Sequence, residues 1–227
     1  MKLVNGLKIL PLCLALVACG ASESDPKKGS PAAALDNAPC VNNVGGSWKF
    51  GVAPDGCDSN SYGSDAAVQS KYSSLVFDET KNSAAETERY VSNMSAFLGE
   101  VSEIYFKQRK RTAQDEELRA WKRSILAMAH QESYWTHYRI SKLDGRLKFM
   151  RGDSGHGYGL MQVDDRWHKG AINKGSAWDI LPHALYTMDM FYKVWNMAAK
   201  APCVTSLEDR SRSAYSMYNG GFSRACR

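Results

Sequence analysis

The stretch AMAHQES, residues 127–133, and the stretch GDSGHGYGLMQVD, residues 152–164, decide the fold of this 227-residue chain. The first reads as the end of an apolar helix that carries a carboxylate, Glu132. In the second, glycine occupies four of the eight positions 152–159, and Asp153 and Asp164 lie at its two ends. Such a density of glycine permits positive φ angles and lets the backbone approach a ligand closely. We therefore expect the helix end and the glycine-dense loop to form one functional site.

Glu132 continues the apolar face of its helix. Leu118, Trp121, Ile125 and Met128 recur at steps of three and four residues, so they share one helical face, and Glu132 is next in the series. Desolvation disfavours the charged form of a carboxyl group and raises its pKa. Protonation of a leaving group requires an acid that is still protonated near neutral pH. The alternative is that the helix frays before Glu132 and the side chain reaches water, and periodicity alone leaves both open.

Asp153 and Asp164 complete a set of three carboxylates. Breaking a glycosidic bond needs one acid to protonate the leaving oxygen and one or two carboxylates to hold a water molecule. If both aspartates face Glu132 across about 6.5–9.5 Å, there is room for that water, as in inverting enzymes. The alternative is structural: Asp153 caps the turn and Asp164 caps the start of a following helix. Taken singly, each aspartate favours this structural alternative.

Three motifs resemble those of the lysozyme-like superfamily, which includes the soluble lytic transglycosylases. Residues 152–168 look very like the corresponding stretch of goose-type lysozymes in that superfamily. Glu132-Ser133 matches the catalytic Glu-Ser pair of the superfamily, and residues 159–162 match its Gly-Leu-Met-Gln motif. Residues 218–221 match its C-terminal Tyr-Asn-Gly/Ala-Gly motif. Three motifs in the right order make a specific signal, whereas any one alone would be weak.

The resemblance implies a role for each matching residue. Glu132 would be the general acid, and Asp153 and Asp164 match the goose-type aspartates that position the hydrolytic water, a pair that typical lytic transglycosylases lack. Tyr218 and Asn219 would line the subsite next to the cleaved bond. The remaining residues expected to bind substrate are Ser133, His156, Tyr158, Met161, Gln162 and His168. The spacing from Glu132 to Asp153 is longer than in the animal enzymes, so the hairpin between them looks enlarged.

The resemblance also implies the fold and the activity. The expected fold is α+β and mostly α: a lysozyme-like fold with a small β-hairpin beside the active-site cleft. The expected activity is that of a peptidoglycan-degrading muramidase, which cleaves the β-1,4 bond between MurNAc and GlcNAc by inverting hydrolysis without a cofactor. One alternative is a lytic transglycosylase that releases 1,6-anhydro products. An alternative of another class is a non-catalytic peptidoglycan-binding lipoprotein.

The N-terminal part of the chain predicts export. Lys2 and Lys8 precede a short apolar run, which is typical of a signal peptide, and LVAC, residues 16–19, resembles a bacterial lipobox. Lipidation of Cys19 would make the protein a lipoprotein of the outer membrane or periplasm, whereas ordinary cleavage nearby would release a soluble form. The expected organisation is a signal peptide (1–18), a flexible tether (19–39), a disulfide-stapled segment (40–62) and the lysozyme-like catalytic domain (63–227).

Cysteine, histidine and charge limit the possible partners. The chain has six cysteines, and four remain when Cys13 and Cys19 of the predicted export signal are set aside. Four cysteines allow three pairings, of which proximity in the sequence favours Cys40–Cys57 together with Cys203–Cys226. No cysteine spacing indicates a metal site, and His130, His137, His156 and His168 fall in no metalloprotease pattern. The formal net charge is +5, of which Lys2 and Lys8 supply two. This bias suits an anionic polymer such as the glycan strands of peptidoglycan and is too small to indicate nucleic acid; a monomer is expected.

Capping and turn signals predict where the elements begin and end. Capping boxes at residues 83–86, 112–115 and 205–208 predict three helix starts. Asp144-Gly145, flanked by alternating apolar residues, predicts a hairpin over residues 138–149 with a tight primed turn. A long helix is expected from Asp179 or its neighbour.

Overall fold

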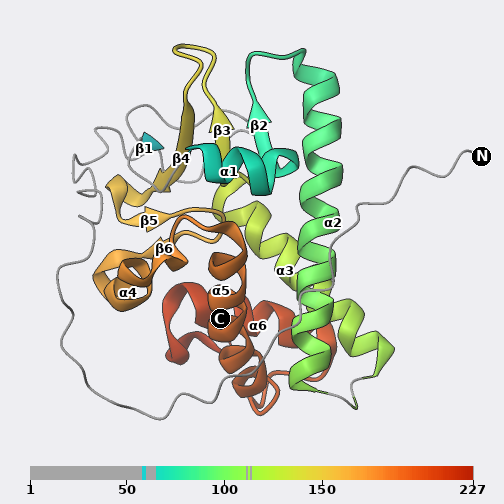
Figure 1. Cartoon of the computed structure of the whole chain (residues 1–227). Coiled ribbons are helices and arrows are strands. Elements are labelled where there is room, and N and C mark those ends of the chain that lie inside the picture. Colours follow the sequence, from blue (N-terminus) through green and yellow to red (C-terminus); the bar gives the residue numbers. More distant parts are fainter. Residues whose placement is uncertain (1–57, 60–64, 111, 113, 227) are drawn as a thin grey trace, which may run out of the picture. The chain divides into compact units, whose positions relative to one another are not determined.

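The computed structural model describes residues 58–59, 65–110, 112 and 114–226, which belong to a single compact unit. The predicted signal peptide, the tether, Cys19 and the Cys40–Cys57 pairing lie outside the described residues and stay predictions. The strands are β1 (Asp58–Ser59), β2 (Val76–Asp78), β3 (Tyr138–Ile140), β4 (Leu147–Gly152), β5 (Gly157–Tyr158) and β6 (Val163–Asp164) (Figure 1). The helices are α1 (Asp65–Tyr72), α2 (Ser83–Arg109), α3 (Asp115–Ser133), α4 (Asp165–Ala171), α5 (Ile180–Ala198) and α6 (Leu207–Gly220). The described part of the chain is α+β and mostly α, as expected.

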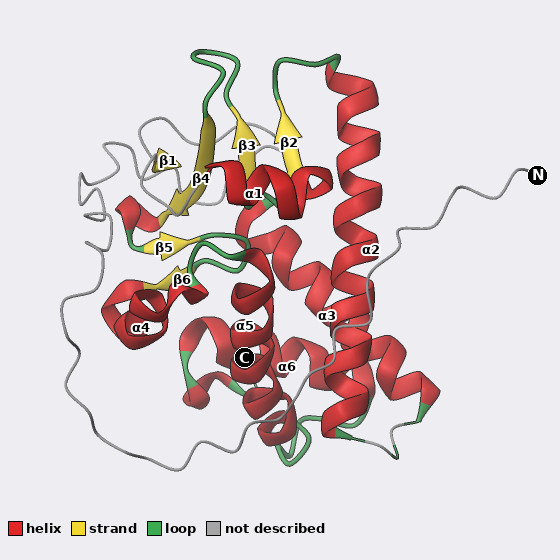
Figure 2. Cartoon of the chain, viewed as in Figure 1, coloured by secondary structure: helices red, strands yellow, loops and turns green. Residues whose placement is uncertain are grey.

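Four long helices form the core. α5 packs against α6, and α2 packs against both α3 and α5. Figure 2 shows β2, β3 and β4 on the side of the upper part of α2, β5 and β6 lower and near α4, and α6 below all of the strands. Trp121 of α3 is fully buried, and its ring lies 5.0 Å from that of Phe106, 5.4 Å from that of Phe191 and 5.7 Å from that of Trp195. This aromatic cluster fixes α3 against α2 and α5, because each buried aromatic side chain removes a large apolar area from water.

α3 confirms the predicted register. Trp121, Ile125 and Met128 are buried, and the helix continues through Ser133, so the alternative that it frays before Glu132 is wrong. The helix ends at Tyr134, whose φ of 51° is left-handed and whose backbone N–H donates to the carbonyl oxygen of His130. Glu132 therefore projects from the last regular turn of α3.

The starts of α2 and α3 differ from the predicted capping boxes. The side chain of Asn82, one residue earlier than predicted, caps α2, and Glu86 accepts instead from the backbone N–H of Asp78. Gln114 precedes α3 without a side-chain cap, so the box at 112–115 does not form. The spacing of a capping box is short and common, and a tertiary partner can claim either side chain.

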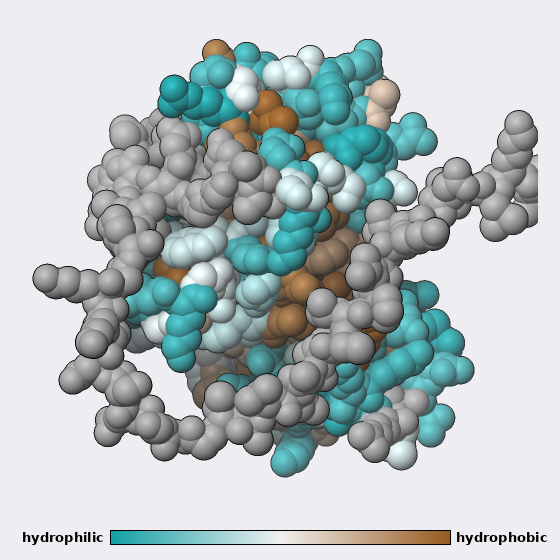
Figure 3. All heavy atoms as spheres, viewed as in Figure 1, coloured by the Kyte–Doolittle hydropathy of each residue, from teal (hydrophilic) through white to brown (hydrophobic). Residues whose placement is uncertain are grey.

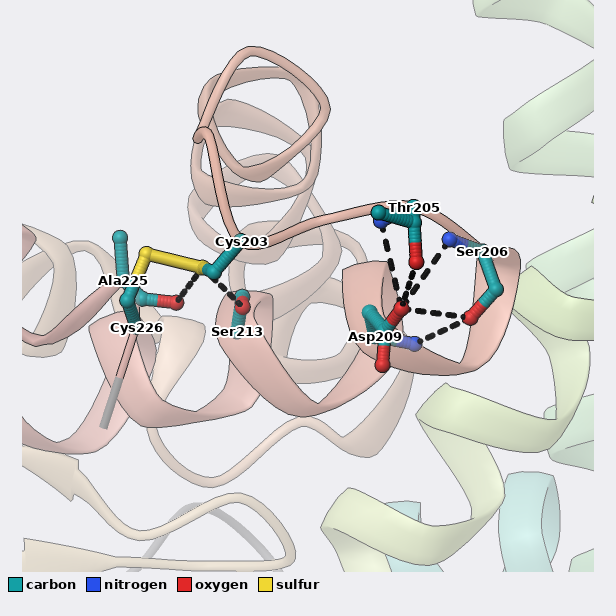
Figure 4. The surroundings of a disulfide bond; sticks show 7 residues. All are labelled: Cys203, Thr205, Ser206, Asp209, Ser213, Ala225 and Cys226. Carbon is teal, nitrogen blue, oxygen red and sulfur yellow. Dashed lines mark hydrogen bonds between the residues drawn. A yellow bond between two sulfur atoms is a disulfide. The ribbon is translucent and has the colours of Figure 1, made fainter.

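α6 does begin with a capping box, but it is formed by Ser206 and Asp209, one residue later than predicted. The carboxylate of Asp209 also accepts from the hydroxyl group of Thr205, as Figure 4 shows. The same figure shows a disulfide between Cys203 and Cys226, the pair that proximity in the sequence favours. It joins Cys203, three residues before the capping Ser206, to the chain beyond the end of α6.

The sheet has the strand order β2-β3-β4-β5-β6, and β1 pairs with β4. β3 and β4 form the predicted hairpin, with Tyr138 opposite Phe149 and Ile140 opposite Leu147. The prediction of a tight two-residue turn is wrong: residues 141–146 form a wider loop in which the N–H of Gly145 donates to the carbonyl of Ser141. The sheet is also larger than the predicted small hairpin, because β2, β5 and β6 belong to it. These three strands are too short to show a strand period in the sequence.

The glycine-dense loop is folded into the end of this sheet. Gly152 at the end of β4 pairs with Gly157 in β5, and Gly157 also pairs with Asp164 in β6. This double pairing brings the residues after β4 and those at the end of β6 to the same edge, although eleven positions separate Asp153 from Asp164 in the sequence.

Some apolar side chains remain near the surface. Figure 3 shows apolar side chains between α2 and α5, two helices that contribute the partly buried Phe97, Val101, Leu181 and Leu185. No helix in the described ranges is both long and apolar enough to cross a membrane.

Candidate active site

Glu132 is partly buried on the side of α3 that faces α6. The hydroxyl group of Tyr215 donates a hydrogen bond of 2.9 Å to Oε1 of Glu132. Burial raises the pKa of Glu132 to about 7, and the Tyr215 hydrogen bond opposes that shift because it favours the charged form. Near neutral pH, this carboxyl group is therefore divided between the protonated and the ionised form.

One face of α6 is turned toward Glu132. Tyr215, Tyr218 and Asn219 are spaced by three and four residues, so they share that face. Burial and then the charge of Glu132 raise the pKa of Tyr218, and its hydroxyl group donates to the carbonyl oxygen of Met161 at 3.1 Å. Tyr218 thus lies between Glu132 and the turn that follows β5.

Asp153 and Asp164 are brought together by a residue that the sequence reasoning missed, Arg166. Nη2 of Arg166 pairs with Oδ2 of Asp153 and, at 2.5 Å, with Oδ2 of Asp164. Asp164 also caps α4 by accepting from the backbone N–H of Arg166 at 2.8 Å, so the structural alternative for this residue is confirmed. The side chain of Asp153 does not cap the turn, and about half of it (52%) is exposed.

The environment of these aspartates is the opposite of that of Glu132. Partial burial would raise the pKa of Asp164, but the hydrogen bonds and the charge of Arg166 outweigh it and hold the pKa below its ordinary value. Asp164 is therefore ionised at any pH near neutral. The site combines one carboxyl group, Glu132, that is still partly protonated near neutral pH with another, Asp164, that is not, which is how acid and base roles are divided in glycosidases.

A chain of side chains leads from the aspartates toward Glu132. The charge of Asp164 opposes the lowering of the His168 pKa by burial. Nδ1 of His168 lies 2.8 Å from the hydroxyl group of Tyr186. The charges of Glu132 and Tyr186 both raise the pKa of Tyr218. Among the described residues, no hydrogen bond or ion pair joins Glu132 directly to either aspartate.

Backbone strain is concentrated at this site. Within the described ranges, positive φ occurs at four residues other than glycine: Tyr134, Trp135, Asp153 and Gln162. The first two lie two and three residues after Glu132, and the other two are predicted site residues. Such conformations cost free energy and tend to persist where a functional site requires them.

The eight residues predicted to bind substrate divide into two groups. Ser133, Tyr158 and Met161 are at most 1% exposed, so their side chains do not fit the prediction that they touch sugar. They have internal partners instead: Ser133 donates to the carbonyl of Leu160 at 2.7 Å, and the Tyr158 ring packs under Arg151. The accessible or partly accessible residues are His156, Gln162, His168, Tyr218 and Asn219.

Two grooves lie elsewhere on the helices. One, of about 720 Å³, runs between α3 and α6 and is lined by Arg119 and Arg123; another, of about 840 Å³, lies between α2 and α3. Neither groove is lined by Glu132 or the two aspartates. In the part of the chain that the structure describes, no group of three or more His, Cys, Asp or Glu residues is arranged to hold a metal ion.

The sequence contained partial signals for the residues that were missed. Tyr215 precedes Tyr218 by three residues, so a helix over this segment places both on one face. Arg166 follows Asp164 by two residues, a spacing that allows a side chain to fold back on a helix cap. Nothing in the sequence indicated that Arg166 would also reach Asp153.

Comparison of the chain with protein-family models, with curated proteins and with solved structures found no match. The case for a function therefore depends on the motifs and on the geometry of the site.

Proposed function

We propose that this protein cleaves the β-1,4 bond between MurNAc and GlcNAc in peptidoglycan, with Glu132 as the general acid, on a lysozyme-like fold. In this proposal it is an exported lipoprotein that acts as a monomer on glycan strands. The observation that carries the proposal is the position of Glu132: it is in register with a buried apolar stripe, and its pKa is raised to about 7.

The first chemical step needs little beyond this carboxyl group. Protonated Glu132 transfers its proton to the glycosidic oxygen, the bond to the anomeric carbon breaks, and positive charge develops on the sugar ring. Tyr215 then stabilises the carboxylate that remains, because its hydroxyl group already donates to Oε1. An acid with a pKa near the working pH gives a useful compromise between protonated fraction and acid strength.

Hydrolysis also needs a water molecule held on the opposite face of the sugar. Asp153 and Asp164 are the candidates, and Arg166 occupies only part of their hydrogen-bonding capacity, since a carboxylate has about four lone-pair sites. The lowered pKa of Asp164 makes it a weak base. In this proposal the pair orients the water and offsets the positive charge of the transition state.

Lytic transglycosylation is the second candidate, and the Arg166 pairing favours it. Two aspartates that share an arginine are less available to water than free ones. Glu132, with a pKa near 7, could give up its proton and then accept one from the muramyl 6-hydroxyl group. That route uses neither aspartate and yields an anhydro sugar.

Digestion of purified sacculi by the wild type and by Glu132→Gln tests the proposal. We expect the wild type to release soluble fragments and the variant to lose about 100-fold to 10,000-fold in rate, the usual range for removal of a general acid. If the variant lyses sacculi as fast as the wild type, the assignment of the acid to Glu132 is wrong. If the wild type binds sacculi but releases nothing, the protein is a binding lipoprotein.

Mass spectrometry of the fragments separates hydrolysis from transglycosylation, because only hydrolysis adds a water molecule and leaves reducing ends. The double variant Asp153→Asn with Asp164→Asn gives a second, independent reading. A hydrolase should slow by about 100-fold or more when its water is no longer held. A transglycosylase should keep nearly all of its rate.

A further inference from the structure

Residues 159–162 join β5 to β6 in a four-residue turn, hereafter the site turn, that links several parts of the candidate active site. On its carbonyl side, Leu160 accepts from Ser133 at the end of α3, and Met161 accepts from Tyr218 of α6. The turn begins with Gly159 at a φ of 65° and ends with Gln162 at a φ of 48°. A turn with two left-handed residues needs support from its surroundings.

The N–H side of the site turn is held by two histidines. The backbone N–H of Leu160 donates to Nδ1 of His137 at 2.9 Å, and that of Met161 donates to Nε2 of His183 at 3.0 Å. The N–H groups of the two flanking residues, 159 and 162, donate to backbone carbonyl oxygens. All four N–H groups of the turn are therefore paired, two of them with imidazole nitrogens, as buried backbone donors require.

The second nitrogen of each ring fixes its protonation. Nε2 of His137 lies 3.0 Å from the carbonyl oxygen of Trp178, and Nδ1 of His183 lies 3.0 Å from that of Ser176. A carbonyl oxygen only accepts, so each of these nitrogens must carry the proton, and the nitrogen facing the turn must be bare. His137 is thus protonated on Nε2 and His183 on Nδ1, which are opposite tautomers.

The environment of both rings keeps them neutral. Both side chains are fully buried, with ring centres 5.0 Å apart. Burial lowers the pKa of both histidines, that of His183 to about 4, and the positive charge of a neighbouring protonated ring would lower that of His137 further. A second proton on either ring would also place an N–H against a backbone N–H of the site turn, which is a repulsive contact.

The close packing of His137 against the site turn explains why residue 159 is a glycine. A Cβ atom at Gly159 would lie 2.6 Å from Cε1 and 2.7 Å from Nδ1 of His137. The φ at this position already favours glycine. The first residue of the Gly-Leu-Met-Gln motif is therefore required both by the turn and by the histidine that holds it.

We propose that His137 and His183 are positioning residues of the active site, which as neutral rings of opposite tautomer hold the site turn against Ser133 and Tyr218. Neither ring touches substrate. Each acts through the turn, which sets Gln162 and the carbonyl oxygen that receives Tyr218. The effect on catalysis rests on the proposed function, whereas the tautomers and the support of the turn do not.

The first test reads the tautomers in the unaltered protein. In a ¹⁵N-labelled sample at pH 7, the ring nitrogen shifts and their couplings to ring protons show which nitrogen carries hydrogen. We expect hydrogen on Nε2 of His137 and on Nδ1 of His183. The same tautomer in both rings, or two protons on either ring, would overturn the inference.

The second test uses amides as reciprocal substitutes. The side-chain oxygen of Asn stands near the Nδ1 position of a histidine, and that of Gln stands near the Nε2 position. His137→Asn and His183→Gln should keep the turn, whereas His137→Gln and His183→Asn should let the N–H groups of Leu160 and Met161 exchange with solvent at least about tenfold faster, as expected for one lost hydrogen bond. His130→Asn, a change of an exposed histidine in α3, is the control and should leave both exchange rates unchanged.

Activity gives the final readout. If the protein lyses sacculi, kcat should fall more than KM rises in the two disruptive variants, and the two matched variants should keep most of kcat. Equal behaviour of Asn and Gln at both positions would contradict the positioning role, even with lytic activity intact. Opposite tautomers and slow exchange in a protein without lytic activity would support this inference and refute the proposed function.

Discussion

Two corners of the candidate site carry the same chemical group in opposite environments. Glu132 lies between α3 and α6 beside a tyrosine, and burial raises its pKa to about 7. Asp153 and Asp164 lie at the edge of the sheet and share Arg166, which holds the pKa of Asp164 low. The comparison teaches that the fold, rather than the residue type, assigns the roles of acid and anion. For stability, replacing the charged group should therefore have a large effect at Glu132 and a small one at Asp153.

The largest expected effect is on stability at Glu132. A folded-state pKa of about 7 against 4.5 means that the folded protein keeps a proton that the unfolded chain has lost between these pH values. Stability therefore falls as the pH rises through this window, by roughly 3 kcal/mol in total. Glu132→Gln removes this titration, and urea unfolding at pH 8 should show the variant more stable by up to that amount.

The matched control for this change is Asp153→Asn, since that side chain is half exposed and paired with a cation. It should not stabilise the protein at pH 8. At pH 4 the advantage of Glu132→Gln should vanish, because the carboxyl group is then protonated in the folded state. A Gln variant no more stable than the wild type at pH 8 would mean that Glu132 is well solvated.

The next effect concerns the rate. If Glu132 is the acid, only its protonated form is active, so the rate of sacculus digestion should fall about tenfold per pH unit above pH 7. Asp164 should not shape this limb, because its lowered pKa keeps it ionised there. A rate that stays constant from pH 7 to pH 9 would exclude Glu132 as the proton donor.

Loss of the Tyr215 donor should widen the difference in pKa between Glu132 and Asp164. Tyr215→Phe removes the hydrogen bond that favours ionised Glu132. A hydrogen bond to a charged group contributes about 1.5–3 kcal/mol, so the pKa of Glu132 should rise by about one unit. Titration of the ¹³C-labelled carboxyl group by NMR measures the shift directly.

Tyr186→Phe is the control for that experiment, because the hydroxyl group of Tyr186 contacts His168 and not Glu132. It should leave the Glu132 titration close to that of the wild type. If both phenylalanine variants shift Glu132 equally, the change comes from general repacking and not from the lost donor.

The smallest effect is expected at Arg166. Arg166→Gln removes the cation that the two aspartates share, and the pKa of Asp164 should move upward toward its ordinary value of 3.8. The shift should be modest and should shrink in high salt, because exposed ion pairs are screened. Carboxyl NMR titration at low and high salt measures it, with Arg123→Gln on α3 as the control. An unchanged titration of Asp164 at low salt would mean that Arg166 is not its partner in solution.

Local features of the sequence predicted much of the helical part. The apolar steps to Met128 were enough to place Glu132 in register, and the β3–β4 hairpin followed from alternation around Asp144-Gly145. Boundaries were less predictable. The capping boxes of α2, α3 and α6 were misplaced or absent, because several nearby polar side chains can each cap a helix and tertiary contacts select among them.

What the sequence determined by itself was therefore the periodic part: which face of α3 is buried, where Glu132 falls on it, and which cysteines near the C-terminus lie close enough to pair. Only the tertiary structure decided which groups surround the carboxylates. Tyr215 reaches Glu132 across 83 positions and Arg166 reaches Asp153 across 13. His137 meets the site turn from the bend before β3, and His183 meets it from α5. Periodicity reports the local backbone, whereas pKa and tautomer depend on neighbours that packing brings from elsewhere in the chain.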